Sequence, residues 1–387
     1  VYGGGSPTGV AYYENGALDP KWNGMLLACE AGKNVVFGYL PVRDGAGFKL
    51  ERFDFMTSNK EKEWAGSDFL GGKPSGDLKT MFRPSDVCVG PDGAIYVADW
   101  FDARVGGHGT LDDGTSGTIY RIAPRGFQSV VPKIDLGTTE GPIEALRSPA
   151  PNVRFSGFAR LKRQGVGAVS QVATLLVDPN PHIAARAIWL LAQLGPEGVA
   201  KVVPFLESDD DTKRLVAYRS LRFIGHEPAV MARRMSLDAS SAIRAEAALM
   251  MRDRSAEESL PVLVAVAKGF DGKDRSYLEA FGLGSKGKEA AVYAAVAKEL
   301  GGSAAEWSPA FSWLAWRLHP AAAAADFKAR ALSGALAEDE RRRMVTALAF
   351  VKSPEAVGHM IELANDKGFP MKDLAQWWLL NRKGNDW

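Results

Sequence analysis

Three stretches of this chain superpose on one another: DPNPHIAARAIWLLAQLG (178–195), SDDDTKRLVAYRSLRFIG (208–225) and LDASSAIRAEAALMMRD (237–253). They recur about every 30 residues, and Ala187, Ala217 and Ala247 fall at matching positions. Asp, Ser or Asn stands near the start of each stretch, and these residues cap helix N-termini. Helical segments repeated at this spacing predict stacked helix pairs, each of which buries its apolar face on the next.

Second helices are expected between these stretches, at VAKVVPFLES (199–208) and AVMARRMSL (229–237). Looser versions of the pattern continue towards the end of the chain, as in AEWSPAFSWLAWRLH (305–319) and DERRRMVTALAFVKS (339–353). We therefore predict that residues 151–387 form an α-solenoid of HEAT-like helical repeats.

Residues 1–126 have the pattern of β-structure, with short apolar runs separated by glycine-rich turns. Pro91-Asp92-Gly93 is typical of a tight hairpin, because proline presets the first turn position and glycine accepts a positive φ. Repeated small sheets joined by such turns favour a β-propeller. The expected strands are GVAYYE (9–14), GMLLACEA (24–31), NVVFGYL (34–40), FKLERFDFM (48–56), DVCVG (86–90), AIYVADW (94–100) and GTIYRIA (117–123).

These strands suffice for about two blades, whereas a propeller closes with about four or more. We expect residues 1–126 to be the C-terminal blades of a propeller whose missing blades lie upstream or in another chain. Residues 127–150 mix Pro, Gly and Thr without a sustained period, and we interpret them as a connector to the helical part.

The bulk composition excludes some classes of function. The chain is 46% hydrophobic and 24% charged, with a formal net charge of +1, which argues against nucleic acid as the main partner. No apolar run is long enough to span a bilayer. Residues 1–20 lack a basic segment followed by an apolar one, so they do not have the pattern of a signal peptide.

The two cysteines, Cys29 and Cys88, lie in strand-like runs. Two buried free thiols are the ordinary expectation, and a disulfide is the alternative in an exported protein. No paired histidines stand beside them at zinc-finger spacing, and the sequence contains no CxxCH motif for covalent haem. The sequence predicts no metal site.

The segment FRPSDVCVGPDGAIYVADWFDARVGGHG (82–109), followed by GTIYRIAPRG (117–126), is similar to the last propeller blade of PVC-type membrane-bound dehydrogenase proteins, which are sorbosone/glucose-dehydrogenase-like. SPTGVAYYENGALDPKWNGMLLACEAGKNVVFGYL (6–40) resembles their preceding blade. AQWWLLNRKGNDW (375–387) resembles the stretch that leads from their helical repeats into a c-type cytochrome domain.

This resemblance implies an exported redox protein, periplasmic or at the cell surface, that oxidises a sugar, polyol or other alcohol. Pyrroloquinoline quinone or a metal ion would serve the complete propeller, and electrons would pass to haem c in an adjacent domain or partner. The early blades, where a catalytic base is expected, and the cytochrome lie outside the matched segments. A non-catalytic propeller and HEAT scaffold that binds a protein or polysaccharide is the alternative.

Six residues are candidates for a site at one face of the propeller. His108, in a glycine-rich loop, could act as a base, and Asp99 could orient it or hold a cation. Arg83 could bind the carboxylates of a quinone cofactor or an acidic substrate through its planar fork. Asp86, Trp100 and Arg104 complete the set. The structural alternatives are a loop histidine bonded to a backbone carbonyl, an aspartate bonded to backbone amides, and an Arg83–Asp86 pair.

Several tryptophans lie in the expected helices. Core packing is their ordinary explanation, and a docking surface for a cytochrome domain or another partner is the alternative. They are Trp307, Trp313, Trp316, Trp377 and Trp378.

Overall fold

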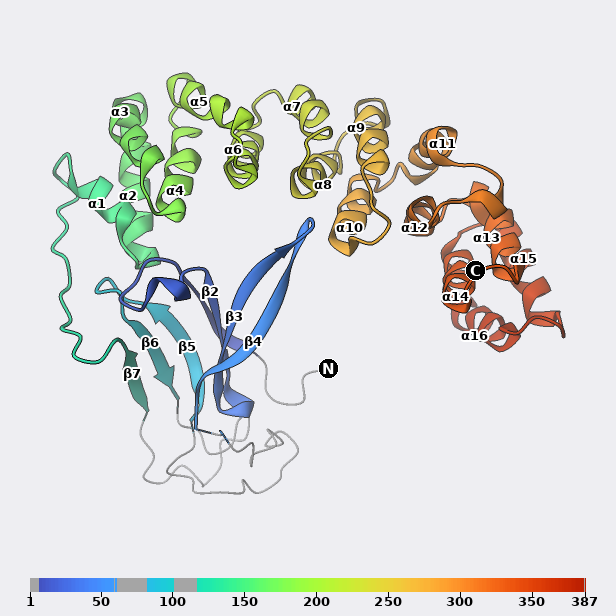
Figure 1. Cartoon of the computed structure of the whole chain (residues 1–387), viewed down its shortest axis with the longest axis horizontal. Helices are drawn as coiled ribbons and strands as arrows, with labels where there is room; N and C mark the ends of the chain where they lie inside the picture. The colour runs from blue at the N-terminus through green and yellow to red at the C-terminus, as the bar shows by residue number, and fades with distance from the viewer. Residues whose placement is uncertain (1–6, 59, 61–81, 101–116, 386) are drawn as a thin grey trace. The chain divides into compact units, whose positions relative to one another are not determined.

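The computed structural model describes residues 7–58, 60, 82–100, 117–385 and 387. The chain divides into two compact units. The first comprises residues 1–43 and 48–205, and the second comprises residues 44–47 and 206–387. Figure 1 labels their strands and helices.

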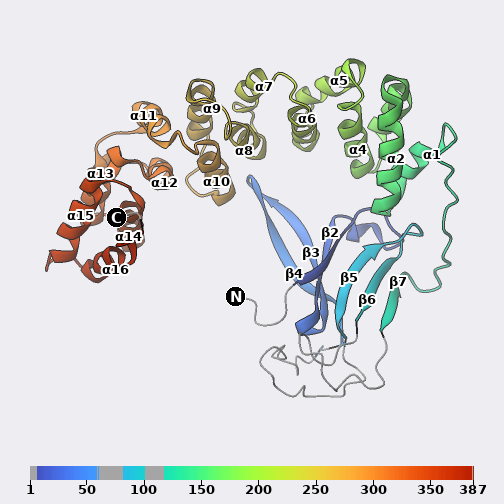
Figure 2. The same ribbon diagram turned by 180° about the vertical axis from the view of Figure 1, so that it is seen from behind.

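The described strands form two small antiparallel sheets. Neighbours in each sheet follow the order of the chain, β1-β2-β3-β4 in the first and β5-β6-β7 in the second (Figures 1 and 2). The bounds are β1 (Pro7–Tyr13), β2 (Met25–Glu30), β3 (Val35–Asp44), β4 (Gly47–Thr57), β5 (Pro84–Val89), β6 (Ile95–Asp99) and β7 (Thr118–Ile122). Each of the seven expected strands is therefore present.

The two sheets share one hydrophobic core. In β2, Met25, Leu27 and Cys29 are fully buried and alternate with partly exposed residues, as expected of a strand with one face in a core. Val87 and Val97 of the second sheet belong to the same core. The sheets approach closely where β1 meets β5, and this closeness explains Gly9. A Cβ atom at Gly9 would lie 2.2 Å from Asp86 Oδ1.

The expected turn between β5 and β6 is confirmed. The Gly93 amide donates to the Gly90 carbonyl at 2.9 Å, and Gly93 has a φ of 83°. Asp92 Oδ1 accepts the Ala94 amide at 3.1 Å, while Tyr96 and Ser129 donate to Asp92 Oδ2. Burial alone would raise the pKa of Asp92, but these hydrogen bonds outweigh it and lower that pKa.

From residue 141 onward the described chain is mainly helical. The first unit holds α1 (Gly141–Arg147), α2 (Pro151–Gln164), α3 (Val169–Ala173), α4 (Pro181–Leu191) and α5 (Pro196–Val202). The second holds α6 (Asp211–Phe223), α7 (Pro228–Met235), α8 (Ser241–Met250), α9 (Ala256–Lys268), α10 (Arg275–Gly284), α11 (Glu289–Leu300), α12 (Pro309–Leu318), α13 (Ala324–Leu332), α14 (Glu338–Phe350), α15 (Pro354–Asn365) and α16 (Lys372–Arg382).

Helices of the second unit lie in two layers (Figures 1 and 2). The even-numbered helices α6 to α16 pack each on the next, and odd-numbered helices such as α7, α9 and α11 form the other layer. The predicted period also holds, because α2, α4, α6 and α8 begin at residues 151, 181, 211 and 241. Ala187, Ala217 and Ala247 are all fully buried, so the matched alanines have one structural role.

Arginine side chains form the same hydrogen bonds at the N-terminal ends of three helices, α2, α6 and α8. Arg154, Arg214 and Arg244 each stand at the fourth helical residue and donate from Nη1 to two backbone carbonyls just before the helix. In Arg244 these distances are 2.7 and 2.8 Å. The arginines supply donors to loop carbonyls, which would otherwise be costly to bury.

Two features of the first unit were not predicted. The expected connector 127–150 contains α1, a helix of seven residues. It packs on α2, and two of its apolar side chains, Ala145 and Leu146, are fully buried. Its seven residues are too few to show a helical period in the sequence.

The second feature is an ion cluster that joins the first sheet to the helices of the same unit. The buried Glu14 carboxylate follows β1 and pairs with Arg154 at 2.5 Å and with Arg186. His182 Nδ1 lies 3.8 Å from the same carboxylate, and its ring meets Tyr12 edge to face. The coarse prediction of a β part followed by a helical part is confirmed by these elements.

Candidate functional site

Arg83 and Asp99, two of the predicted site residues, lie together at the ends of β5 and β6. Both are buried. The Arg83 amide donates to Asp99 Oδ1 at 2.9 Å, and Arg83 Nη1 donates to the Ala31 carbonyl at 2.8 Å. Asp99 thus accepts a hydrogen bond from a backbone amide, which is the structural role that the sequence offered as the alternative to a catalytic one. Through the bond to Ala31, the Arg83 side chain ties the second sheet to the segment that follows β2 in the first.

The remaining predicted residues do not gather around this pair. Asp86 is exposed on β5, and its Oδ1 accepts the neighbouring Val87 amide at 2.8 Å. Trp100 is 51% exposed, and its amide donates to the Arg83 carbonyl at 2.9 Å. Arg104 and His108 lie outside the described residues. Of the predicted set, the structure brings together Arg83, Asp99 and the backbone of Trp100.

The expectation of two buried thiols holds for one cysteine only. Cys29 is buried in the core between the sheets, and burial raises its pKa to about 12. Cys88 is exposed, because Val87 and Val89 on either side of it point into the core and the strand alternates. Both thiols are free, so the alternative of a disulfide is not realised in this structure.

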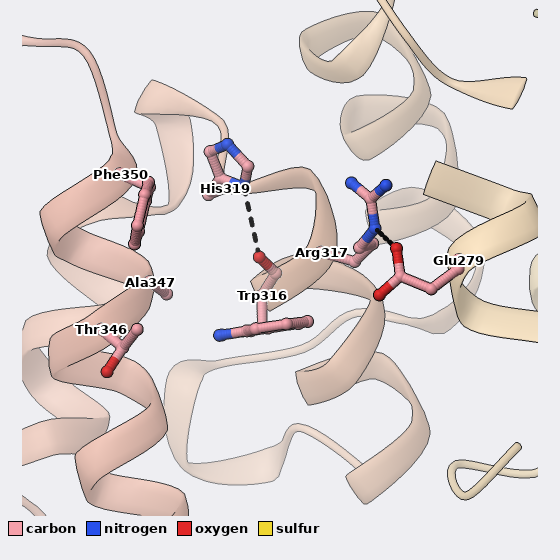
Figure 3. A pocket seen from close by; sticks show the side chains of 7 residues that line it. All are labelled: Glu279, Trp316, Arg317, His319, Thr346, Ala347 and Phe350. Carbon is pink, nitrogen blue, oxygen red and sulfur yellow. Dashed lines mark hydrogen bonds and ion pairs between the residues drawn. The ribbon is translucent and has the colours of Figure 1, made fainter. Parts of the chain in front are cut away.

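A pocket in the second unit was not predicted. It has a volume of about 260 Å³ and lies between side chains of α10, α12 and α14 (Figure 3). Ligand sites typically combine apolar and aromatic walls with a few polar groups, at volumes of about 300 Å³ upward. This pocket therefore matches a single small ring rather than a larger molecule. Its lining residues are Glu279, Trp316, Arg317, His319, Thr346, Ala347 and Phe350.

One polar wall of the pocket is an ion pair between α10 and α12. Arg317 Nε donates to Glu279 Oε2 at 2.8 Å (Figure 3), and Arg275 Nη2 lies 2.5 Å from Glu279 Oε1. The Arg317 guanidinium rests on Gly282 of α10, where a Cβ atom would lie 2.1 Å from Arg317 Cζ. Gly282 thus makes the room that lets Arg317 lie flat against α10.

Aromatic rings form the second type of wall. Trp316 is half-buried, and the Arg275 guanidinium lies 4.9 Å from its ring centre. Trp313 meets Trp316 edge to face at 5.3 Å, outside the pocket lining. Phe350, the last residue of α14, is 38% exposed. The pocket is therefore lined by two partly exposed aromatic rings, those of Trp316 and Phe350.

His319 lies next to these rings at the end of α12. It has a φ of 32°, in the left-handed region that a residue other than glycine seldom adopts, and Pro320 follows it. Its Nδ1 lies 3.4 Å from the Trp316 carbonyl (Figure 3). A carbonyl oxygen only accepts, so Nδ1 carries the proton in this bond and Nε2 is left as an acceptor. Burial is the main reason that the pKa of His319 is lowered, so the ring is neutral at pH 7.

Together these groups can bind a polar ring. The pocket offers guanidinium donors, a histidine acceptor, a threonine hydroxyl and two aromatic surfaces. Among the described residues, no group of three or more His, Cys, Asp or Glu side chains is placed to hold a metal ion. The sequence singled out Trp316, with core packing as its ordinary explanation and a docking surface as the alternative, and no motif marked Arg317 or His319.

Comparisons with known proteins add little beyond this geometry. A family model described as "Domain of unknown function (DUF7133)" matches residues 4–124, which is the β part of the chain. No curated protein matches the chain. A crystal structure of an engineered protein is similar at 15% identity and a TM-score of 0.32, over 64% of this chain and 79% of that one. A likeness that weak carries no argument about fold or function.

Within the part of the chain that the structure describes, every helix is too short or too polar to cross a bilayer.

Proposed function

We propose that the helical unit is a binding module for a sugar ligand, attached to C-terminal blades of an exported, dehydrogenase-like propeller protein. On this proposal the two sheets are propeller blades and the two layers of helices are a HEAT-like solenoid. Solenoids commonly bind their partners through repeated helices of one layer, as the pocket between α10, α12 and α14 would require.

The observation that carries the proposal is the mixture of groups in the pocket. Sugar rings have faces of C–H groups that pack on the electron-rich face of an aromatic ring, and a rim of hydroxyls that both donate and accept. Trp316 and Phe350 supply aromatic surface, while His319 and Thr346 supply acceptors beside it. A purely apolar ligand would leave these polar groups unpaired.

The proposal is tested by calorimetric titration of the 387-residue chain with neutral and acidic monosaccharides and with short oligosaccharides. We expect binding in the millimolar to micromolar range that is lost in W316A. W377A is the matched control, because Trp377 is also a tryptophan on a helix of the second unit but does not line the pocket. If every sugar failed to bind, or if W377A lost binding as fully as W316A, the proposed site would be wrong.

A second candidate function, sugar or alcohol oxidation in the complete propeller, is supported by the resemblance of residues 82–109 and 117–126 to dehydrogenase blades. Two face-to-face sheets of sequential antiparallel strands agree with it. On this proposal the missing blades complete the active site, a quinone such as pyrroloquinoline quinone or a metal ion accepts the electrons, and haem c removes them. Arg83 and Asp99 would then stabilise the blade from its interior.

This second candidate predicts a redox spectrum for the protein as its producing cells make it. Natively purified material should come from the periplasm or cell surface and show a c-type haem band, from an adjacent domain or a bound partner. That band should shift to the reduced form when sugars or polyols are added. A native protein without any chromophore would remove the support for oxidation and leave the binding module.

A further inference from the structure

We infer that the sugar recognised by this pocket carries a carboxylate, as a uronate residue does, and that Arg317 is the residue that selects it. This inference rests on the proposed sugar-binding function and names the chemical class of its ligand. It follows from the hydrogen-bond donors of Arg317 that remain unused, from the charge around its guanidinium, and from the other groups that line the pocket.

The donors of Arg317 are only partly used. Among the described residues, its one hydrogen bond is the bond from Nε to Glu279, so the two terminal nitrogens, Nη1 and Nη2, are available to a ligand. These two nitrogens form the outer edge of a rigid planar fork, the geometry that pairs with both oxygens of a carboxylate. Figure 3 shows them on the side of the guanidinium away from Glu279.

The position of the fork is also fixed before any ligand arrives. Glu279 holds Nε from one side, and the backbone at Gly282 supports the flat face of the group. Because the side chain is already ordered, less rotamer entropy is lost when a ligand binds. Arg317 is therefore built as a receptor for a planar anion, whereas a lysine there would present a single mobile charge.

Charge around the fork favours an anion. Arg275 and Arg317 both pair with Glu279, which is the single carboxylate of the pocket lining, so this group of three carries one excess positive charge. His319 adds no negative charge in either of its protonation states. A ligand carboxylate would neutralise the excess in a partly desolvated site, where charge-assisted hydrogen bonds are stronger than in water.

The remaining lining groups suit the rest of a sugar acid. His319 Nε2 is an acceptor in the tautomer that the Trp316 carbonyl selects, so it can accept a ring hydroxyl. Thr346 donates its own hydroxyl proton to the Arg342 carbonyl at 3.1 Å, which leaves its oxygen as a second acceptor. Two acceptors in the same pocket as a donor fork would pair poorly with a bare carboxylate such as acetate, because such an ion has no hydroxyl to donate.

The experiment compares matched sugars on the 387-residue chain by calorimetry: D-glucuronate with D-glucose, and D-galacturonate with D-galactose. We expect each acid to bind at least tenfold more tightly than its neutral partner at low salt, since one charge-assisted bidentate contact contributes that much. R317M should remove this preference, and R317K should keep only part of it because lysine lacks the fork.

G282A provides a second route to the same conclusion, because it displaces Arg317 without removing it. We expect G282A to reduce uronate binding at least fivefold while leaving the helical circular dichroism signal intact. R252M, which removes an exposed arginine outside the pocket, is the control for charge and should bind as the unaltered chain does.

The outcomes distinguish a failure of the carboxylate inference from a failure of the proposed sugar-binding function. If neutral sugars bind as tightly as their acids, or if R317M keeps the preference for acids, the carboxylate inference is overturned and sugar binding stands. If neither kind of sugar binds, the proposed function fails and the inference fails with it. Tighter binding of acids that depends on Arg317 supports both.

Discussion

At the scale of single residues, burial decides how much each ion pair contributes to stability. Glu14 is only 8% exposed and holds two arginines, whereas Glu207 is 75% exposed in its pair with Arg234. E14Q keeps the shape of the side chain but leaves two guanidiniums without their counter-charge. We expect it to lower the free energy of unfolding by about 3 kcal/mol, as breaking a buried pair does. Urea titration followed by circular dichroism measures this.

E207Q is the matched control for E14Q. It makes the same chemical change in an exposed pair, where the expected loss is at most about 1 kcal/mol because water screens the charges. Equal losses in the two variants would mean that the Glu14 cluster does not stabilise the first unit in the way its burial suggests.

A second residue-scale prediction concerns pH. Burial lowers the pKa of His319, Arg317 lowers it further, and the Trp316 carbonyl and Glu289 oppose the shift. The unfolded chain therefore binds the proton more readily than the folded one below the ordinary histidine pKa of about 6.5. Stability should consequently fall as the pH drops from about 7 through 6. Carboxylates with lowered pKa values, such as Glu340, change the pH dependence of stability only at more acidic pH, where they become protonated.

H319N isolates this contribution, because asparagine tolerates the left-handed backbone of residue 319 and does not titrate. Urea midpoints measured between pH 5.5 and 7.5 should slope less in H319N than in the unaltered chain. His182, whose pKa burial also lowers, keeps its share of the slope in both proteins. Parallel slopes would contradict the prediction.

At the scale of elements, glycines show where helices approach each other most closely. Gly284 ends α10, and a Cβ atom there would lie 2.2 Å from the Ala248 carbonyl oxygen of α8. A backbone atom cannot swing aside as a side chain can, so G284A must push the two helices apart. We expect a loss of about 1–3 kcal/mol in the free energy of unfolding, typical of overpacking.

G358A makes the same substitution inside α15, where a Cβ atom would have no neighbour within 4 Å. Alanine is the better helix former, so this variant should gain about 0.5–1 kcal/mol. Chemical denaturation of both variants under one set of conditions tests the pair. Shifts of the same sign in G284A and G358A would show that helix propensity, rather than the approach of α8 and α10, governs these sites.

Elements with a local signal were predictable from the sequence. Short apolar runs between glycine-rich turns gave the strands, and the spacing of alanines and helix caps gave the helices that begin at residues 181, 211 and 241. The helix α1 was missed because its seven residues contain less than two full periods of the helical pattern. Cys88 was misplaced because a short apolar run does not reveal which of its residues face the core.

The pocket could not be predicted, because its parts meet only through packing. Arg317 and Glu279 are 38 residues apart, and no spacing rule connects them. The sequence shows several tryptophans in the helical segments, but it does not indicate which of their rings face the core. Trp307 is buried as expected, whereas Trp316 lines the pocket and Trp377 is exposed. The sequence does not indicate why residue 282 is a glycine, because the reason is the Arg317 guanidinium that packs against it.

At the scale of the whole molecule, the first sheet presents an unusual surface. Its face turned away from the core carries a group of apolar or aromatic side chains paired across β1, β2 and β3, next to the Glu30–Val35 pair: Val10, Tyr12, Leu26, Ala28, Phe37 and Tyr39. Val10 is 65% exposed. Apolar sheet faces of this kind normally pack against another layer, so this face is where a preceding blade would dock if the sheets belong to a propeller.

This surface predicts how the 387-residue chain behaves when it is alone in solution. We expect it to self-associate reversibly as its concentration rises, because exposed apolar side chains on this face, such as Val10, favour burial against a second copy. V10K places a charge in the middle of the face and should shift the equilibrium towards monomer. V177K is the control, since Val177 is 86% exposed outside the sheets and should leave association unchanged. Sedimentation velocity over a hundredfold range of concentration measures both. If the chain stays monomeric at every concentration, or if V10K associates as strongly as the unaltered chain, this face does not drive association. The apolar face would then give no support for a preceding blade.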